Sequence, residues 1–214
     1  MEITWYGHSC FRIMERSMAS VVADPYDHNV VGYTPLKLRS DIVTISQDEP
    51  GHNFVSAVKG NPFLIKGPGE YEIGGVFITA IQTDGRGKKK SDEPSNTLYV
   101  FEYESVTVAH LGNLRSVPSQ TDIEALGQVN IALVPVGGGN GLTAANAGEV
   151  VSMLEPGIVI PMQFSTPDTA VNLEPLDKFL KEMGAGTPIP EPILKISRST
   201  VPTETRIVIL DYKH

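Results

Sequence analysis

The sequence predicts an α/β protein folded as a four-layer αββα sandwich, in which two β-sheets are covered by helices. Strand-like runs fill the first half of the chain, and in the second half such runs alternate with segments of helical spacing. The 20 glycines and 16 prolines of the 214 residues separate short apolar runs, as expected for many strands and tight turns. This order favours a sandwich over an all-β barrel, although periodicity alone does not separate it from other α/β arrangements.

Strands are expected throughout the first half, because its short runs are apolar or alternate between apolar and polar residues. The predicted strands there span residues 2–6, 10–14, 19–23, 41–46, 63–65, 71–73, 76–81, 97–102 and 105–109. The last two resemble a hairpin that turns near Tyr103 and Glu104. The polar stretch 83–95 between the earlier strands and this hairpin is expected to be an exposed loop.

The second half is expected to contain three helices. Ser119 or Thr121 caps a short helix over 121–126, and Thr143 caps a helix over 143–154 that ends before Pro156. An amphipathic helix over 173–183 ends at Gly184. Strands are predicted at residues 130–136, 157–162, 193–196 and 206–210. Since no Pro/Ser-rich linker divides the chain, residues 1–214 are expected to form a single domain.

Charge and composition exclude several classes of partner. The net charge of −8 would repel a phosphate backbone, so we expect no nucleic acid. The basic residues Arg86 and Lys88 to Lys90 lie among turn residues and are expected to be a solvated loop. No apolar run is long enough to cross a membrane. The single cysteine, Cys10, forms no internal disulfide, and a cytoplasmic setting is the simplest expectation.

Several segments resemble one known family, and they occur in its order along nearly the whole chain. They are residues 3–11 (ITWYGHSCF), 24–25 (DP), 46–53, 67–71 (GPGEY), 96–97 (NT), 110–113 (HLGN), 135–138 (PVGG) and 161–163 (PMQ). Together they resemble the metallo-β-lactamase superfamily, in its branch of lactonase-like, metal-dependent hydrolases. The resemblance implies the αββα sandwich and a metal-dependent hydrolytic site in a cleft.

The sequence departs from this family where the metal ligands are expected. In the His-x-His-x-Asp-His signature, only the last histidine is present, as His52. The other signature positions are Gln47, Glu49 and Gly51. A further histidine of the family falls near Gly85, the next is present as His110, the bridging aspartate is Asn113, and the last histidine is Gln163.

These replacements remove most of the ligands that a dinuclear centre needs. Each zinc takes about three imidazole, carboxylate or thiolate ligands, and glycine supplies none. Asn113 lacks the charge of a bridging carboxylate, and amides such as Gln163 bind zinc poorly. We therefore expect no metal cofactor, with one divalent cation, Zn²⁺ or Mn²⁺, held by Glu49, His52 and His110 as the alternative.

Each remaining site residue also has a structural interpretation. His52 and His110 are equally well explained as buried histidines that are hydrogen-bonded to neighbours. The resemblance gives Asp24 the role of supporting a ligand histidine, and here it would bond backbone N–H groups or His52. His8 lies in a turn and is either structural or part of the cleft. Cys10 is expected to be a small buried apolar residue.

One glycine motif suggests a different ligand. Residues 139–144 (GNGLTA) match G-x-G-x-x-A between a predicted strand and a predicted helix, which is a weak signal for dinucleotide binding. The residue about twenty positions further on is Gln163 rather than an acid. A loop beside the cleft is the favoured interpretation.

Three functions remain open, and with them whether the chain is an enzyme. The first is a pseudo-enzyme that binds a small polar ligand or a protein partner in the former active-site cleft. The second is a hydrolase of esters, lactones or phosphodiesters with one atypical metal ion. The third is metal-free acid–base catalysis by Glu49 with His52 or His110. Self-association is left open.

The first interpretation makes a geometric prediction. Its six cleft residues should line one pocket, with amides bonded to one another, to the histidines or to water, and with Glu49 paired to a histidine. The six are Gln47, Glu49, His52, His110, Asn113 and Gln163.

Overall fold

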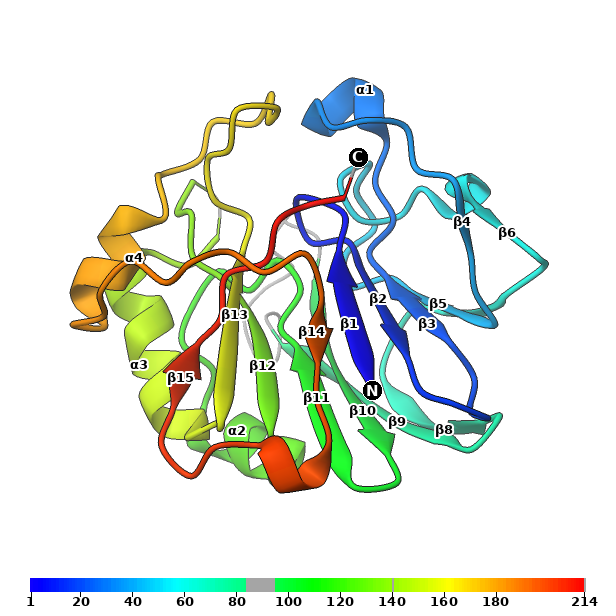
Figure 1. The fold of residues 1–214 in the computed structure, drawn as a ribbon. Coiled ribbons are helices and arrows are strands. Elements are labelled where there is room, and N and C mark those ends of the chain that lie inside the picture. The colour runs from blue at the N-terminus through cyan, green and yellow to red at the C-terminus, as the bar shows by residue number, and fades with distance from the viewer. Residues whose placement is uncertain (84–94, 140, 214) are drawn as a thin grey trace.

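The computed structural model describes residues 1–83, 95–139 and 141–213, which form two stacked β-sheets with helices outside them (Figure 1). One sheet has the strand order β14-β1-β2-β3-β5-β7. The other has the order β15-β13-β12-β11-β10-β9-β8. The predicted α/β sandwich is therefore confirmed. The basic residues around Lys88 and the position near Gly85 lie outside the described residues.

The N-terminal sheet is built from short strands. They are β1 Glu2–Trp5, β2 Phe11–Met14, β3 Val21–Ala23, β5 Ile42–Thr44, β7 Phe63–Ile65 and β14 Leu194–Lys195. A separate pair, β4 Leu38–Arg39 and β6 Val58–Lys59, lies parallel. β3 is parallel to β5, so the chain leaves both strands at the same edge of the sheet.

The C-terminal sheet changes from antiparallel to parallel pairing along the chain. Its strands are β8 Gly69–Ile73, β9 Val76–Thr83, β10 Asn96–Tyr103, β11 Val106–His110, β12 Ile131–Pro135, β13 Ile158–Met162 and β15 Arg206–Ile207. β10 and β11 form the predicted hairpin, with Tyr103 paired to Val106. From β11 onward β12, β13 and β15 are all parallel, and their carboxyl ends lie at one edge.

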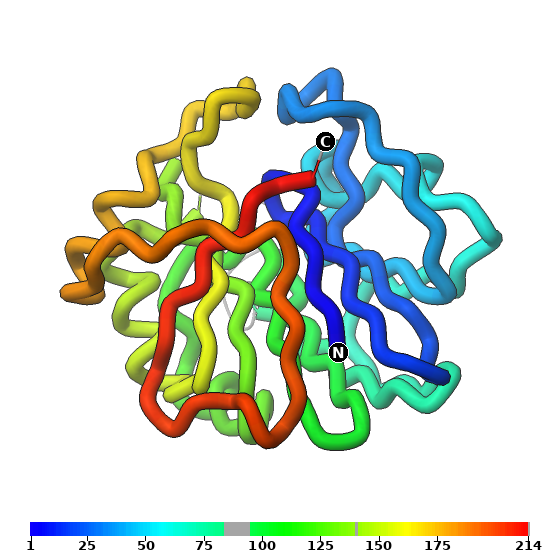
Figure 2. Tube along the Cα trace, in the orientation of Figure 1, coloured from blue at the N-terminus to red at the C-terminus, as the bar shows by residue number. Residues whose placement is uncertain are grey.

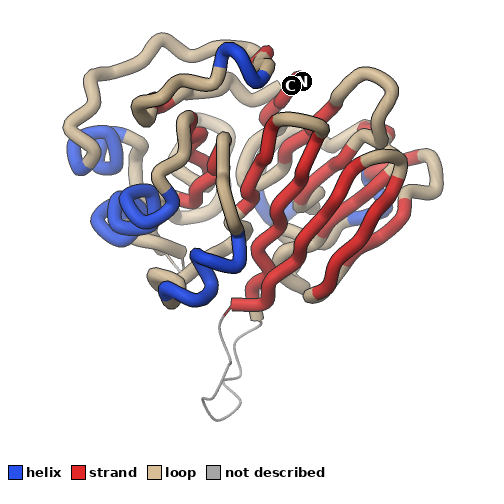
Figure 3. The backbone as a smooth tube through the Cα atoms, turned by 90° about the horizontal axis from the view of Figure 1, so that it is seen from below, coloured by secondary structure: helices blue, strands red, loops and turns tan. Residues whose placement is uncertain are grey.

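Most of the helical residues lie beside the C-terminal sheet. The helices are α1 His28–Val31, α2 Gln120–Leu126, α3 Ala144–Leu154 and α4 Asp177–Glu182, with 3₁₀ turns at Val55–Ala57 and Arg198–Thr200. α2, α3 and α4 group on one side of the molecule, and α1 lies apart from them at one end of the sandwich (Figure 1). The grouping of most helical segments on one side is also visible in Figure 3. No helix of the described residues is long and apolar enough to span a membrane.

Two apolar clusters hold these layers together. The larger contains residues of both sheets and of α2, α3 and α4, and includes Trp5, Phe101 and Ile160, each at most 1% exposed. The smaller lies on the outer face of the N-terminal sheet, where Cys10 and Val22 pack with Tyr26. The N-terminal sheet separates the two clusters, because successive side chains of a strand such as β2 point to opposite faces of the sheet.

Two predicted elements are shorter in the structure, and one short α-helix was not predicted. The helix expected over 173–183 spans only Asp177–Glu182, because Glu174 instead bonds the backbone of Gly137 and Ser165, and Pro175 has no N–H to donate. The strand expected over 206–210 ends at Ile207. α1 was not predicted, since its four residues are too few to show a helical period.

The C-terminal segment returns to β1, at the end of that strand remote from the N-terminus (Figure 2). It runs over the end of β1, where the N–H of Lys213 donates to the carbonyl of Trp5 at 2.9 Å. The Tyr212 ring meets the edge of the Trp5 ring at a centroid distance of 5.7 Å. Both ends of the chain are thus anchored on the same sheet.

Replacing the cap of α2 is expected to have a small, measurable effect. Ser119 Oγ accepts from the N–H of Asp122 at 3.2 Å and satisfies a donor that no helix carbonyl can reach. Ser119→Ala should lower the free energy of unfolding by about 1 kcal/mol in urea titration. The control is Ser56→Ala, at an exposed position, which should change stability by less than about 0.5 kcal/mol. Equal losses in the two variants would contradict the cap.

Candidate functional site

The polar loops of the two sheets meet at one end of the sandwich. Asp24 directly follows β3, and the segment that contains Gln47 and His52 follows β5. On the other sheet, Asn113 and Gln163 follow β11 and β13. Because these strands run parallel within each sheet, the chain leaves them at the same edge, and side chains distant in sequence converge there.

A cavity of about 440 Å³ opens between these loops. Four of the six predicted cleft residues line it, namely Glu49, His52, Asn113 and Gln163. It is also lined by His8, the α1 residues Val30 and Val31, the glycines at 51, 138, 139 and 141, and residues 171–173. The motif at 139–144 therefore borders the cleft as a loop, as expected; its Asn140 lies outside the described residues.

Asp24 is the centre of a buried hydrogen-bond network beneath this cavity. Its carboxylate is fully buried and accepts from the N–H of Ser46 at 2.7 Å and from the hydroxyl of Ser46 at 2.5 Å. Nδ1 of His52 lies 2.8 Å from the same carboxylate. Burial alone would raise the pKa of Asp24. The His110 and His52 rings and the hydrogen bonds from His52 and Ser46 outweigh it and hold the pKa below its ordinary value.

His52 is oriented by Asp24. Since the carboxylate is charged, Nδ1 of the ring carries the proton and donates to it, and the Ser9 hydroxyl lies 3.0 Å from the same nitrogen. No hydrogen bond joins the other ring nitrogen, Nε2, to a residue in the described ranges. His52 lines the cavity, so this lone pair is the basic group of the site. The expectation that Asp24 bonds His52 and a backbone N–H is confirmed.

His8 packs beside His52, with their ring centroids 5.2 Å apart. Burial lowers the pKa of His8, and the neighbouring His52 ring lowers it further, to about 3. The imidazole is therefore neutral at pH 7. Nδ1 of His8 is buried and has no hydrogen-bond partner among the described residues. A Cβ atom at Gly51 would lie 3.1 Å from Nε2 of His8, so this ring fills the space beside the glycine.

His110 is placed differently from the prediction. Its Nε2 donates to the carbonyl of Ser9 at 2.9 Å, and its Nδ1 accepts from the N–H of Gly112 at 3.2 Å. Both ring nitrogens are therefore occupied by backbone groups, and the ring lies in the core rather than on the cavity. Burial lowers the pKa of His110. His110 was expected to be either a metal ligand or a buried histidine that is hydrogen-bonded to its neighbours. The structure has the buried, hydrogen-bonded histidine.

The predicted amide contact forms at one side of the cleft. Asn113 Nδ2 donates to Gln47 Oε1 at 2.7 Å. Gln47 is 1% exposed and lies behind Asn113, bordering a different cavity. The prediction that Gln47 lines the same pocket as Gln163 is therefore wrong, because Gln47 lies behind Asn113 and borders the other cavity.

Glu49 also differs from the prediction. It was expected to pair with His52 or His110, but its nearest ionic partner is Arg115 at 3.7 Å. The Glu49 side chain is 42% exposed, so it lies at the rim of the cavity. An exposed pair of this kind contributes little to stability. The anion of the site is Asp24 rather than Glu49.

Three residues at or beneath the cleft have a left-handed backbone. His8, Asp24 and Gln163 have φ values of 49°, 47° and 54°, a region that side-chain-bearing residues seldom adopt. Gln163 Nε2 is buried without a hydrogen-bond partner among the described residues. A buried donor without a partner costs about 1–3 kcal/mol, and the acceptor oxygen of a ligand would satisfy it.

Cys10 does not belong to the cleft. Its thiol is fully buried in the smaller apolar cluster, and burial raises its pKa. His8 lines the cavity, whereas Cys10, two residues further along the chain, faces the outer layer. Cys10 is the small buried apolar residue that was expected.

The donors that line the cleft do not fit a dinuclear metal centre. The described residues contain no group of three or more His, Cys, Asp or Glu side chains that could hold one metal ion. His110 is bonded to backbone, and Glu49 lies at the rim beside Arg115. The alternative ligand set of Glu49, His52 and His110 therefore does not converge in this structure.

Some members of the network were not singled out from the sequence. Ser9 and Ser46 contact the His52–Asp24 pair, and Asn96 accepts the N–H of Asn113 at 2.9 Å through its side chain. Arg115 completes the rim. Serine and asparagine are common in loops, so no spacing marks them; Asn96 and Ser46 could have been found only through the family segments that contain them.

A family model and a solved structure that match this chain both belong to the beta-lactamase superfamily. A family model described as "Beta-lactamase superfamily domain" matches residues 2–163. A solved structure from Thermotoga maritima, of the metallo-beta-lactamase superfamily, superposes with a TM-score of 0.80 and 33% identity, covering 98% of this chain and 97% of that one.

Two curated relatives are similar over most of their length. The UPF0173 protein of Pyrococcus furiosus is 27% identical, covering 86% of this chain and 90% of that protein. The UPF0173 metal-dependent hydrolase of Thermoplasma acidophilum is 23% identical, covering 78% and 85%. The name of the latter describes a metal-dependent enzyme, so the relatives give no support to the expected absence of a metal cofactor.

Proposed function

This chain belongs to the beta-lactamase superfamily domain family, and on that premise we propose that it hydrolyses a small uncharged ester or lactone beside His52. The observation that carries the proposal is the contact between His52 Nδ1 and Asp24 at 2.8 Å, which leaves Nε2 as a base at the cavity. Relatives named as metal-dependent hydrolases support the reaction class. The donor set does not fit a dinuclear centre, so no step is assigned to a metal.

In this proposal His52 is the general base. Asp24 fixes the tautomer with its proton on Nδ1 and stabilises the ring when Nε2 takes a proton from water. The water oxygen then forms a bond to the carbonyl carbon of the substrate. As the tetrahedral intermediate collapses, the bond from this carbon to the alcohol oxygen breaks, and the protonated His52 returns its proton to that oxygen, so that the acid and the alcohol leave and the base is regenerated. Gln163 Nε2, a buried donor without a partner in the described ranges, is placed to donate to the oxygen on which negative charge develops.

The charge of the cavity favours an uncharged substrate. Among the described residues that line it there is no lysine or arginine, and Glu49 at its rim is paired with Arg115. A phosphodiester would bring a negative charge with no cation among the described lining residues to offset it. Esters and lactones carry no such charge, and the volume of about 440 Å³ suits a small molecule.

A second candidate function is ligand binding without turnover. The bond between Asn113 and Gln47 favours it, because two amides satisfy each other at positions where the resemblance implies metal ligands. A small polar ligand or a segment of a protein partner would then occupy the cavity. Calorimetry that detects binding of an ester, combined with no hydrolysis after long incubation, would favour this candidate over the first.

Replacing the base is expected to remove hydrolysis. His52→Ala should lower kcat/KM for the best ester or lactone of a panel by about 10²–10⁴-fold, the usual contribution of general base catalysis. The matched control, His28→Ala, removes a histidine from α1 that does not line the cavity and should keep activity within about twofold. Equal activity of wild type and His52→Ala would contradict the proposal.

A chelator separates this mechanism from a metal-dependent one. The proposal predicts that ester hydrolysis is unchanged after dialysis against EDTA and after addition of Mn²⁺. Activity that disappears in EDTA and returns with Mn²⁺ would instead assign hydrolysis to a single cation and would overturn the base role of His52.

A further inference from the structure

A second cavity, separate from the cleft, is lined by cations. It has a volume of about 570 Å³ and is bordered by Arg12, Lys37, Arg39 and Lys213. The remaining described lining residues are Tyr6, Thr34, Pro35, Leu36 and Leu38, so no aspartate or glutamate of the described ranges borders it. It shares no lining residue with the cleft beside His52. This concentration of positive charge contrasts with the net charge of −8 of the chain.

The four cations come from parts of the chain that are far apart in sequence. Arg12 lies on β2, where it is paired with Thr4 and Val22 of the neighbouring strands. Lys37 and Arg39 belong to the segment that leads through β4. Lys213 is held by the hydrogen bond from its N–H to Trp5. The fold therefore assembles this basic group, and the sequence shows no basic run there.

The four cations of this cavity lack an ion pair with the acidic residues that the structure describes. None of the four forms an ion pair within 4.0 Å with a described acidic residue. Asp41, whose charge interacts with Arg12, is instead hydrogen-bonded to Ser20. Nε of Arg12 is buried and has no hydrogen-bond partner in the described part of the chain.

The buried Nε of Arg12 is the part of this cavity that a bound anion would satisfy. A buried donor without a partner costs free energy that a charge-assisted hydrogen bond would recover, and the exposed Lys37, Arg39 and Lys213 at the same cavity would add to the attraction for an anion. The planar fork of Arg12 matches phosphate geometry, and the lysines add charge without fixed direction. Tyr6, Leu36 and Leu38 give the cavity an apolar wall for the remainder of a small molecule.

We propose that this cavity, formed by Arg12, Lys37, Arg39 and Lys213, binds a small phosphate-bearing molecule. The site is independent of the proposed hydrolysis. The volume lies within the range of small-molecule sites, and a phosphate of charge near −2 matches several cations better than a monocarboxylate does.

Titration calorimetry with inorganic pyrophosphate at low ionic strength tests the proposal on the full chain. One pyrophosphate should bind per chain. The exposed double variant Lys37→Ala/Lys213→Ala should weaken binding by at least about tenfold, and Arg12→Met should weaken it further. Citrate, a polyanion without phosphate, should bind at least about tenfold more weakly than pyrophosphate.

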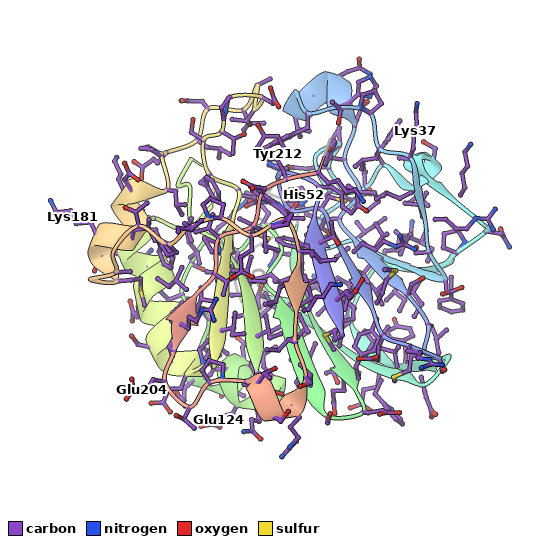
Figure 4. All side chains as sticks on the ribbon, in the orientation of Figure 1. Lys37, His52, Glu124, Lys181, Glu204 and Tyr212 are labelled. Atoms are coloured by element: carbon purple, nitrogen blue, oxygen red, sulfur yellow. The ribbon has the colours of Figure 1, made fainter. Side chains whose placement is uncertain are left out.

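The control is Lys66→Ala/Lys181→Ala, which removes two exposed lysines that do not border this cavity. Lys37 and Lys181 lie on opposite sides of the molecule (Figure 4). The control should bind pyrophosphate as the wild type does. No binding at millimolar pyrophosphate, equal weakening in both double variants, or equal affinity for citrate would overturn the proposal.

Discussion

Asp24→Ala is expected to lower the free energy of unfolding by about 3–5 kcal/mol, because several buried hydrogen-bond donors lose their acceptor at about 1–3 kcal/mol each. The carboxylate is fully buried and accepts from the Ser46 N–H, the Ser46 hydroxyl and His52. Its removal leaves these donors without an acceptor in a site closed to water. Ester hydrolysis should be lost as well, because His52 loses the group that fixes its tautomer.

The chain offers a matched control for this variant. Asp41 accepts from the N–H of Ser20 at 2.8 Å and from the Ser20 hydroxyl at 2.7 Å, but it is exposed. Asp41→Ala should therefore cost only about 1 kcal/mol in the same denaturant titration. If Asp24→Ala fails to fold, Asp24→Asn keeps the shape and still removes the charge. Equal, small losses for Asp24 and Asp41 variants would contradict the central role of Asp24.

The second large effect is a loss of stability in mild acid. His8 has a folded-state pKa of about 3, whereas an unfolded histidine titrates near pH 6.5. Between these values the unfolded state binds the proton and the folded state does not, so stability falls as pH decreases. From pH 7 to pH 4 this one ring should account for about 2–3 kcal/mol. His110 acts in the same direction, since burial lowers its pKa.

The pH dependence can be assigned to His8 with one variant. His8→Asn keeps a residue that tolerates the left-handed backbone at φ 49° but does not titrate. Between pH 6 and pH 4, the slope of unfolding free energy against pH should decrease by about 1 kcal/mol per pH unit. The Asp24 carboxylate does not contribute in this window, because its lowered pKa places its loss of stability at lower pH. An unchanged slope would contradict the buried, neutral His8.

The sequence predicted the strands better than the short helices, and the reason is physical. Alternation along Phe11–Met14 and the apolar run Ile131–Pro135 are set by burial on one or both faces, which a pattern reveals. The helix at Ala144–Leu154 was found through its Thr143 cap. The start of α4 was missed because backbone bonds of Glu174 to a distant loop prevail over its amphipathic spacing.

The site was predicted in part for a similar reason. Which segments converge follows from strand direction, so the grouping of His52, Asn113 and Gln163 around one cavity could be expected. Where each side chain points depends on loop dihedrals that no pattern encodes. The positive φ of Gln163 and the contacts that turn His110 to the backbone are examples. The basic cavity could not be predicted from the sequence, because its four cationic residues lie in three separate segments of the chain.

Metal analysis of the active protein tests the central claim most directly. The central claim is that Asp24 and His52 carry the chemistry of the cleft. The described residues of the cleft include no group of three ligands for a metal ion. Protein purified without chelator, and hydrolysing its ester at full rate, should contain well below one equivalent of zinc, manganese or other transition metal per chain by plasma mass spectrometry. One or two tightly bound equivalents per chain would contradict it.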